Sequence, residues 1–238
     1  MRKLSIVIPA YNEGAFIGKL LDQVLAVPTE SLGFQKEVIV VDDGSRDNTA
    51  QAARAFSDVR VLTQVPNQGK GRAVRRGILE STGDYILIQD ADLEYDPQDY
   101  LALLGGLATG DVVYGSRVLG QKRKRTGLLA GKHPGQGLGP WVAGIGLTLW
   151  TAAIYGRWIT DTLTAYKLYP ADVVKKMELR TSGFETDHEI TAKLIRQGLR
   201  IVEVPIEYYP RSRDEGKKIK ATDGLIALWT LLRFRFAD

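Results

Sequence analysis

The feature that most constrains the fold of this chain is a regular alternation of short apolar runs with helical stretches. The apolar runs lie at residues 5–9, 37–41, 59–63, 85–89 and 112–115. Residues 13–27 carry apolar side chains at helical spacing, and residues 69–81 form a later expected helix. Continuous apolar strands that alternate with helices are typical of a parallel sheet covered on both faces. The sequence therefore predicts an α/β fold with a doubly wound, mostly parallel sheet.

The 238 residues fit one α/β domain with a terminal extension. We expect a catalytic domain at 1–220 and an amphipathic helix at 221–238, packed on the domain or on a membrane surface. A second apolar segment, 138–154, contains no charged residue. It reads as a buried helix, as a helix lying on a bilayer, or as a short membrane span.

Charge and cysteine content indicate the compartment and the kind of partner. The absence of cysteine removes disulfides, thiolate nucleophiles and zinc–sulfur sites, and fits a reducing compartment. The apolar run after the basic N-terminus is too short for a signal peptide. A net charge of +4, with basic clusters at 122–125, 211–220 and 233–235, favours anionic partners. We expect a cytoplasmic protein peripherally associated with the membrane.

Three acids follow the strand at 85–89, at alternating positions: Asp90, Asp92 and Glu94. Alternating side chains of an extended segment point to the same side, so the three carboxylates are expected to converge. Such convergence is electrostatically costly unless a cation is present, and carboxylate oxygens suit Mg²⁺ or Mn²⁺. The competing interpretation is a solvated acidic loop.

Two further acids, Asp42 and Asp43, follow the second strand, where a carboxylate can bind a ribose or a base. They are equally suited to capping the next helix. The glycine triplet of dinucleotide-binding folds is absent after the first strand, and the loop at 67–72 is not a Walker loop. We expect this loop instead to bring Lys70 or Arg72 near a bound donor.

Five short segments carry a resemblance to a known family. They are Ile8-Pro9-Ala10-Tyr11-Asn12-Glu13, Val41-Asp42-Asp43-Gly44-Ser45, Asn67-Gln68-Gly69-Lys70-Gly71, Gln89-Asp90-Ala91-Asp92 and Gly115-Ser116-Arg117. Their order is that of family 2 glycosyltransferases. With residues 183–193 and 204–219, nearly the whole chain resembles the polyprenyl-phosphate branch, typified by dolichyl-phosphate mannose and glucose synthases.

The resemblance implies a GT-A fold and inverting transfer of a hexosyl group. The donor would be a nucleotide sugar of the GDP-mannose or UDP-glucose type, and the acceptor a polyprenyl or dolichyl phosphate at the cytoplasmic membrane face. It also assigns roles by position: Pro9, Tyr11, Glu13 and Asp42 or Asp43 to the nucleoside; Asp90, Asp92 and Glu94 to the metal; Arg117, Arg211 and Lys217 or Lys218 to phosphates. Lys70 and Ala91 are further candidates for donor binding.

Two positions depart from the pattern. The third metal position, often glutamine in the mannose enzymes, is Glu94, which leaves the sugar unassigned. The basic segment has one extra residue between Arg211 and Lys218, which leaves open whether Lys217 or Lys218 contacts phosphate.

The acceptor decides whether the reaction needs a base. A phosphate monoester is largely dianionic near neutral pH and needs none, which favours direct displacement at the anomeric carbon. The alternative is a soluble hydroxyl or polysaccharide acceptor, for which Glu185 or Asp187 would be the base. His133 and His188 read as surface or packing residues.

Other classes fit less well. A sugar nucleotidyltransferase would carry a glycine- and arginine-rich loop after the first strand, and the intact acids argue against a binding protein that has lost catalysis. Nucleic-acid binding is not expected, because the basic clusters lack interleaved aromatic residues. The sequence carries no indication of oligomeric state.

Overall fold

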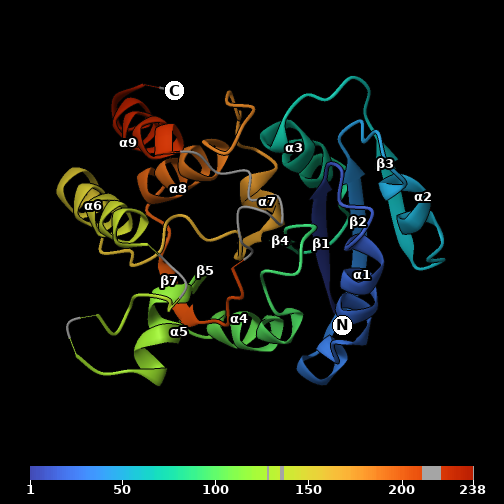
Figure 1. Ribbon diagram of the computed structural model, residues 1–238, viewed down its shortest axis with the longest axis horizontal. Helices are drawn as coiled ribbons and strands as arrows, with labels where there is room; N and C mark the ends of the chain where they lie inside the picture. Colours follow the sequence, from blue (N-terminus) through green and yellow to red (C-terminus); the bar gives the residue numbers. More distant parts are fainter. Residues whose placement is uncertain (128, 135–136, 211–220, 238) are drawn as a thin grey trace.

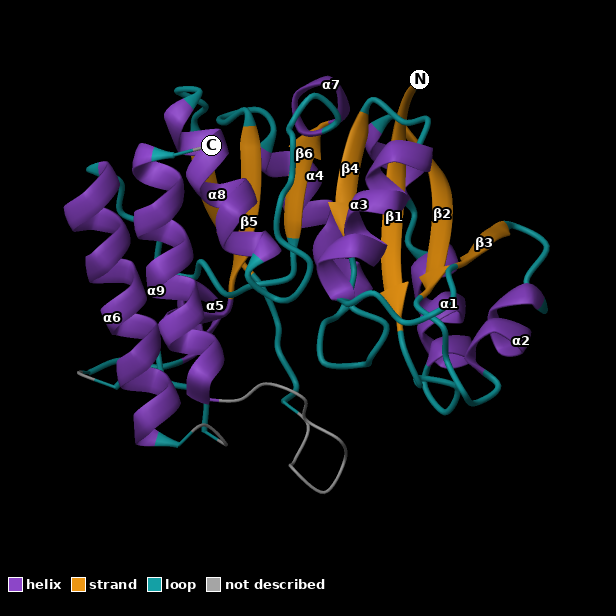
Figure 2. Ribbon diagram, turned by 90° about the horizontal axis from the view of Figure 1, so that it is seen from above, coloured by secondary structure: helices purple, strands orange, loops and turns teal. Residues whose placement is uncertain are grey.

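The structure is a computed structural model that describes residues 1–127, 129–134, 137–210 and 221–237. In this part of the chain seven strands form one sheet, in the order β3-β2-β1-β4-β6-β5-β7 (Figure 2). Their bounds are β1 Arg2–Ala10, β2 Phe34–Asp42, β3 Val59–Thr63, β4 Tyr85–Ile88, β5 Val112–Ser116, β6 Lys167–Pro170 and β7 Ile201–Pro205. All neighbouring strands run parallel except β6, which is antiparallel to both β4 and β5.

Helices cover both faces of this sheet (Figure 1). The α-helices are α1 Ile17–Ala26, α2 Thr49–Arg54, α3 Lys70–Glu80, α4 Tyr100–Gly106, α5 Arg117–Lys124, α6 Leu138–Tyr155, α7 Ala171–Val174, α8 Thr186–Arg196 and α9 Ala221–Phe236. Short 3₁₀ turns lie at Thr29–Leu32 and Pro97–Asp99. The expected α/β fold with a doubly wound, mostly parallel sheet is confirmed.

Alternation along β1 explains why the core has two layers. Ile6 and Ile8 of β1 pack in one cluster with Leu20 of α1 and with residues of α4. Val7, between them, belongs to a second cluster that contains Ile78 of α3 and residues of α8. Successive strand residues point to opposite faces, so an unbroken apolar run supplies both layers.

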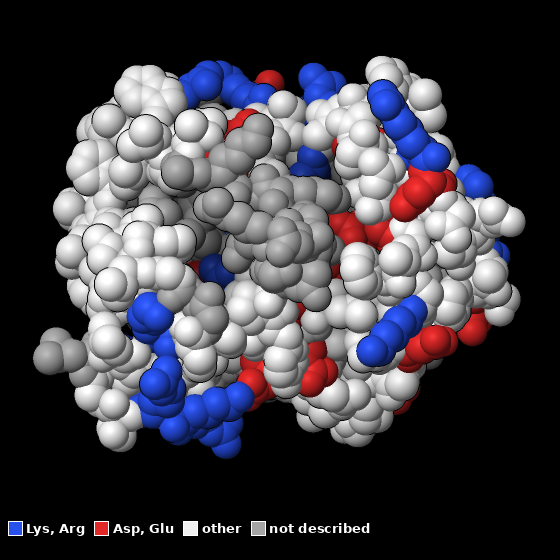
Figure 3. Space-filling model, in the orientation of Figure 1, with Lys and Arg blue, Asp and Glu red and all other residues white. Residues whose placement is uncertain are grey.

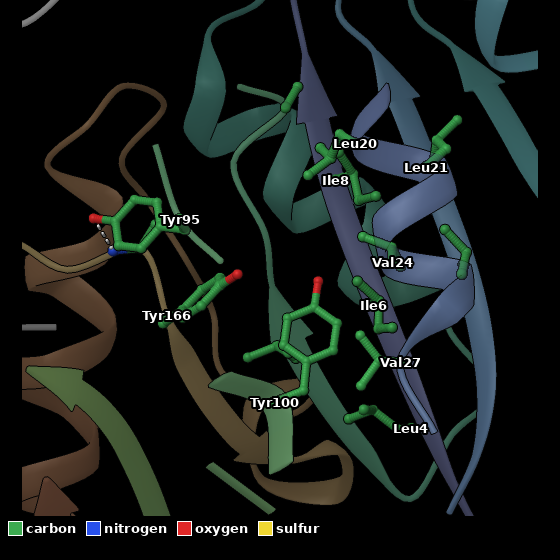
Figure 4. Close-up of a cluster of buried hydrophobic side chains, with 14 of the residues drawn as sticks. Leu4, Ile6, Ile8, Leu20, Leu21, Val24, Val27, Tyr95, Tyr100 and Tyr166 are labelled. Atoms are coloured by element: carbon green, nitrogen blue, oxygen red, sulfur yellow. Dashed lines mark hydrogen bonds between the residues drawn. The ribbon is translucent and has the colours of Figure 1, made fainter. Parts of the chain in front are cut away.

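A polar contact inside the core fixes the end of β4, directly before the acidic run. The buried side chain of Gln89 accepts hydrogen bonds from the hydroxyls of Tyr100, at 2.6 Å, and Tyr166, at 2.7 Å. Figure 4 shows these two tyrosines and Tyr95 beside the apolar side chains of β1 and α1. The side-chain nitrogen of Gln89, Nε2, also donates to the backbone carbonyl of Asp90 at 2.8 Å. Gln89 therefore links the core tyrosines to the backbone at the start of the acidic run.

The two apolar segments outside the sheet pair as helices. α6 lies beside α9, and α9 packs on α8 (Figures 1 and 2). Leu147 of α6 and Leu231 of α9 are buried in one small cluster, and Trp150 Nε1 donates to the carbonyl of Leu228 at 3.1 Å. Among the described residues, α6 alone is long and apolar enough to cross a membrane by length and composition. Most of α6 is exposed.

Candidate functional site

The parallel strands β1, β2 and β4 end at one edge of the sheet, where a pocket of about 260 Å³ opens. It is lined by Pro9, Ala10, Tyr11, Glu13, Asp43, Asn67, Gly69, Lys70, Ala73, Asp90, Ala91, Asp92, Glu94 and Phe184. The expected nucleoside, donor and metal residues thus meet in one place, except Asp42. Ligands of open α/β sheets bind at this edge, outside the carboxyl ends of the strands.

The two β2 acids have different surroundings. Asp43 lines the pocket, and its carboxylate accepts bonds from the backbone amides of Gln68 and Gly69, both at 2.8 Å. It thereby holds the loop that carries Lys70. Asp42 is 2% exposed and accepts a bond from the amide of Ser45 at 3.2 Å, which makes it a turn-forming residue.

The glycines before and after Lys70 allow the backbone position from which its side chain lines the pocket. Gly69 has a φ of +95°, a conformation that side chains disfavour. A Cβ on Gly71 would lie 2.7 Å from the carbonyl carbon of Ser182, so only glycine lets α3 approach this segment. Lys70 Nζ then lies 2.6 Å from Asp90 Oδ1 and 3.9 Å from Asp187 Oδ2. Burial opposes its charge, but Asp90 and Asp187 outweigh burial and raise the pKa of Lys70.

The acidic run is not extended, so the predicted alternation of its side chains is wrong. Residues 91–94 form bends rather than strand, and the amide of Glu94 donates to Asp92 Oδ1 at 3.1 Å. Asp90 faces Lys70, while Glu94 Oε2 accepts a bond from the Tyr208 hydroxyl at 2.8 Å. All three acids line the pocket. Among the described residues, however, no three His, Cys, Asp or Glu side chains form a group that could hold a metal ion.

A second charged group lies at the end of β5, outside the pocket lining. The guanidinium of Arg117 donates to both carboxylate oxygens of Asp161, each at 2.7 Å, and its backbone amide donates to the same residue at 3.0 Å. Asp161 is itself fixed, since its amide donates to Glu203 Oε1 at 3.0 Å. Burial opposes the charge of Arg117, but Asp161 outweighs burial and raises the pKa of Arg117. Sequence reasoning found Arg117 but missed both acids.

The reversed direction of β6 brings an unexpected lysine to the same edge. Because β6 is antiparallel, its first residue, Lys167, lies where the parallel strands end. This side chain is fully buried, with Nζ 3.4 Å from Asp187 Oδ1, an ion-pair contact without hydrogen-bond geometry. Burial would raise the pKa of Asp187, but Lys167 and Lys70 outweigh it and hold that pKa below its usual value.

The other predicted residues either make local packing and hydrogen-bond contacts or lie outside the described residues. The Glu185 carboxylate turns back to its own loop and accepts a bond from the amide of Gly183 at 3.1 Å. His188 is buried, as a packing residue would be, and burial lowers its pKa to about 4. His133 is half-buried against the ring of Tyr208. Arg211, Lys217 and Lys218 lie outside the described residues.

Comparisons with known proteins show the family of this chain. Residues 5–151 match the family model described as Glycosyl transferase family 2. An undecaprenyl-phosphate mannosyltransferase of Micrococcus luteus is 32% identical over 99% of this chain and 99% of its own length. A dolichyl-phosphate beta-glucosyltransferase of Trichomonas vaginalis is 30% identical over 95% of this chain and 71% of its own length. The chain belongs to glycosyl transferase family 2 and is a glycosyltransferase.

Solved structures agree on the fold. Glucosyl-3-phosphoglycerate synthase from Mycobacterium tuberculosis, crystallised with Mn²⁺, UDP and phosphoglyceric acid, matches with a TM-score of 0.70 at 21% identity, over 100% of this chain and 80% of that one. Mannosyl-3-phosphoglycerate synthase from Rubrobacter xylanophilus matches with a TM-score of 0.70 at 19% identity, over 98% and 72%. The expected GT-A fold is confirmed.

Proposed function

We propose that this glycosyltransferase transfers a hexosyl group, with inversion, from a nucleotide sugar to a polyprenyl phosphate. Similarity along nearly the whole length of the undecaprenyl-phosphate mannosyltransferase supports this acceptor class. The relatives include both mannosyl and glucosyl transferases, so GDP-mannose and UDP-glucose are the donors to test.

The surroundings of Asp187 favour a phosphate acceptor over a hydroxyl acceptor. A general base works best when its pKa lies near the working pH. The two lysines that flank Asp187 hold its pKa below its usual value, the opposite direction. Glu185 is engaged by its own loop. A weakly basic Asp187 favours an acceptor that arrives already ionised, as a phosphate monoester does.

The acids that line the pocket are suited to a divalent cation. Asp90, Asp92 and Glu94 supply carboxylate oxygens, which Mg²⁺ and Mn²⁺ both accept. The ammonium of Lys70 against Asp90 indicates that a cation is favourable at this position. A metal bound here would stabilise the charge of the departing nucleoside diphosphate. Asp92→Ala should therefore abolish transfer at any metal concentration, and near-normal activity would contradict this role.

Chain residues would then perform the other tasks. Pro9, Tyr11, Glu13 and Asp43 would bind the nucleoside, and Lys70 would contact the diphosphate. Arg117 would meet the acceptor phosphate, together with Arg211 and Lys217 or Lys218. An acceptor phosphate oxygen would form the new bond to the anomeric carbon as the bond from that carbon to the diphosphate breaks. No proton needs to move.

The outer faces of α6 and α9 support peripheral contact with a membrane. Leu138, Val142, Ile145 and Leu149 recur at helical spacing on α6, and each is more than 40% exposed. On α9 the exposed large apolar residues are Leu225, Ile226, Trp229 and Phe236. Figure 3 shows a largely uncharged surface over α6 and a group of lysine and arginine side chains near α5, whose last turn carries Lys122, Arg123 and Lys124. Apolar helix faces with basic neighbours are suited to anionic bilayers.

Vesicle flotation tests this contact. The double variant Leu225→Asp, Trp229→Asp should stay in solution when vesicles of anionic phospholipid float. Wild-type protein and Leu79→Asp, which changes an exposed leucine on α3, should float. Equal flotation of all three proteins would contradict the proposed surface.

The transfer reaction tests the function itself. The chain is incubated with radiolabelled GDP-mannose or UDP-glucose, Mn²⁺, and either a short polyprenyl phosphate or the matching polyprenol. We expect label in the organic phase with one donor and only with the phosphate. Label transferred to polyprenol would refute the phosphate acceptor.

A further inference from the structure

Tyr208 lies between the two charged groups of the site. It follows β7, and its hydroxyl donates to Glu94 Oε2 at 2.8 Å. The guanidinium carbon of Arg117 lies 4.9 Å from the centre of the same ring. One side chain thus contacts an acid of the donor pocket and the arginine expected at the acceptor phosphate.

The backbone keeps Tyr208 in this place. Tyr95 and Tyr208 form an antiparallel bridge, and the amide of Tyr209 donates to the carbonyl of Glu94 at 2.8 Å. The rings of Tyr95 and Tyr208 pack with centroids 5.2 Å apart. The end of the acidic run and the segment after β7 therefore form one unit, although they are more than a hundred residues apart in the sequence.

The phenol has different chemistry toward its two neighbours. The hydroxyl of Tyr208 donates its hydrogen to the Glu94 carboxylate, which can only accept. That bond fixes one carboxylate oxygen and thereby orients the other. Arg117 is bound along one edge by Asp161, and its cation lies over the electron-rich ring face. The ring thus limits where the guanidinium can move.

We propose that Tyr208 is a positioning residue that orients Glu94 through its hydroxyl and Arg117 through its ring, so that the donor and acceptor halves of the site are set together. The proposal rests on the proposed function for the roles of Glu94 and Arg117. It also gives a reason for glutamate at position 94, since a carboxylate accepts this hydroxyl more strongly than an amide oxygen does.

Two variants separate the two contacts. Tyr208→Phe removes the hydroxyl and keeps the ring, while Tyr208→Leu removes both. Mn²⁺ affinity is measured by electron paramagnetic resonance with nucleoside diphosphate present, and the KM for polyprenyl phosphate by transfer. Tyr208→Phe should weaken Mn²⁺ binding roughly tenfold, as expected for a hydrogen bond to a charged group, with the acceptor KM within about twofold of wild type. Tyr208→Leu should raise the acceptor KM as well.

Controls separate this role from general damage. Tyr209→Phe changes the adjacent tyrosine, which is 56% exposed, and should leave both measurements unchanged. In a Glu94→Gln background, Tyr208→Phe should have little further effect on Mn²⁺ affinity, because the two changes remove the same contact. A full additional loss there, or equal behaviour of Tyr208→Phe and Tyr209→Phe, overturns the proposal. If wild type fails to transfer to polyprenyl phosphate, the proposed acceptor fails while the Mn²⁺ measurements still decide the role of the hydroxyl.

Discussion

Replacing Asp161 by asparagine tests how the site holds Arg117. The change keeps the shape of the side chain but removes the counter-charge of Arg117, whose side chain is only 22% exposed. Loss of one partner of a buried ion pair costs about 3–5 kcal/mol. Because the arginine keeps some contact with solvent and the asparagine oxygen can still accept one bond, we expect about 2–3 kcal/mol.

For a chain of this length, that loss corresponds to a fall in Tm of roughly 4–12 °C. Urea unfolding followed by circular dichroism measures the free energy, and differential scanning calorimetry measures Tm. Glu178→Gln is the matched control, because Glu178 pairs with Arg180 at 3.8 Å on the surface, with 78% of the acid side chain exposed. Such pairs contribute about 1 kcal/mol or less. Equal losses for the two variants would refute the claim that burial makes the Arg117 pair important.

Three further outcomes follow from the same contacts. Lys70→Met should weaken binding of the nucleoside diphosphate about tenfold or more in calorimetric titration, and unchanged affinity would contradict a contact with the diphosphate. His188 has a pKa of about 4 in the folded chain, against an ordinary 6.5. As the pH is lowered from 6.5 to 4, this histidine therefore takes up a proton in the unfolded chain first, and the free energy of unfolding of the wild type should fall. The free energy of unfolding, measured in urea, should depend less on pH in that range in His188→Gln. An equal dependence would assign acid unfolding to other groups. Gly71→Ala should lower Tm and donor affinity together, since its Cβ would meet Ser182; a tolerated alanine would show that this approach can relax.

Much of the sheet was predictable because each parallel strand is a continuous apolar run. The expected strand at 59–63 coincides with β3, and the others agree within a few residues at their ends. β6 and β7 were missed. β6 spans four residues and begins with a buried lysine, and β7 carries Glu203 in its centre, so neither has the apolar pattern of the other strands.

The location of the site was predictable for the same topological reason, but its internal contacts were not. Acids after β2 and β4 had to meet at one edge once the sheet was parallel. The turn within the acidic run depends on the Asp92 side chain accepting a backbone amide, which strand periodicity does not express. Lys167 reaches the site on the reversed strand, Asp161 on the segment between α6 and β6, and Tyr208 on the segment after β7, and no short motif marks them. A lysine inside an apolar stretch, at Tyr166-Lys167-Leu168, was the one available signal.

The structure of the product tests the central claim most directly. Wild-type chain, a nucleotide sugar, Mn²⁺ and a short polyprenyl phosphate are incubated, and the lipid fraction is analysed by mass spectrometry and by proton–phosphorus NMR. A phosphodiester that joins the anomeric carbon to the lipid phosphate, with configuration inverted relative to the donor, is the predicted product. A glycoside on a hydroxyl group, or a lipid phosphate that remains a monoester while the donor is consumed, would contradict the proposed reaction.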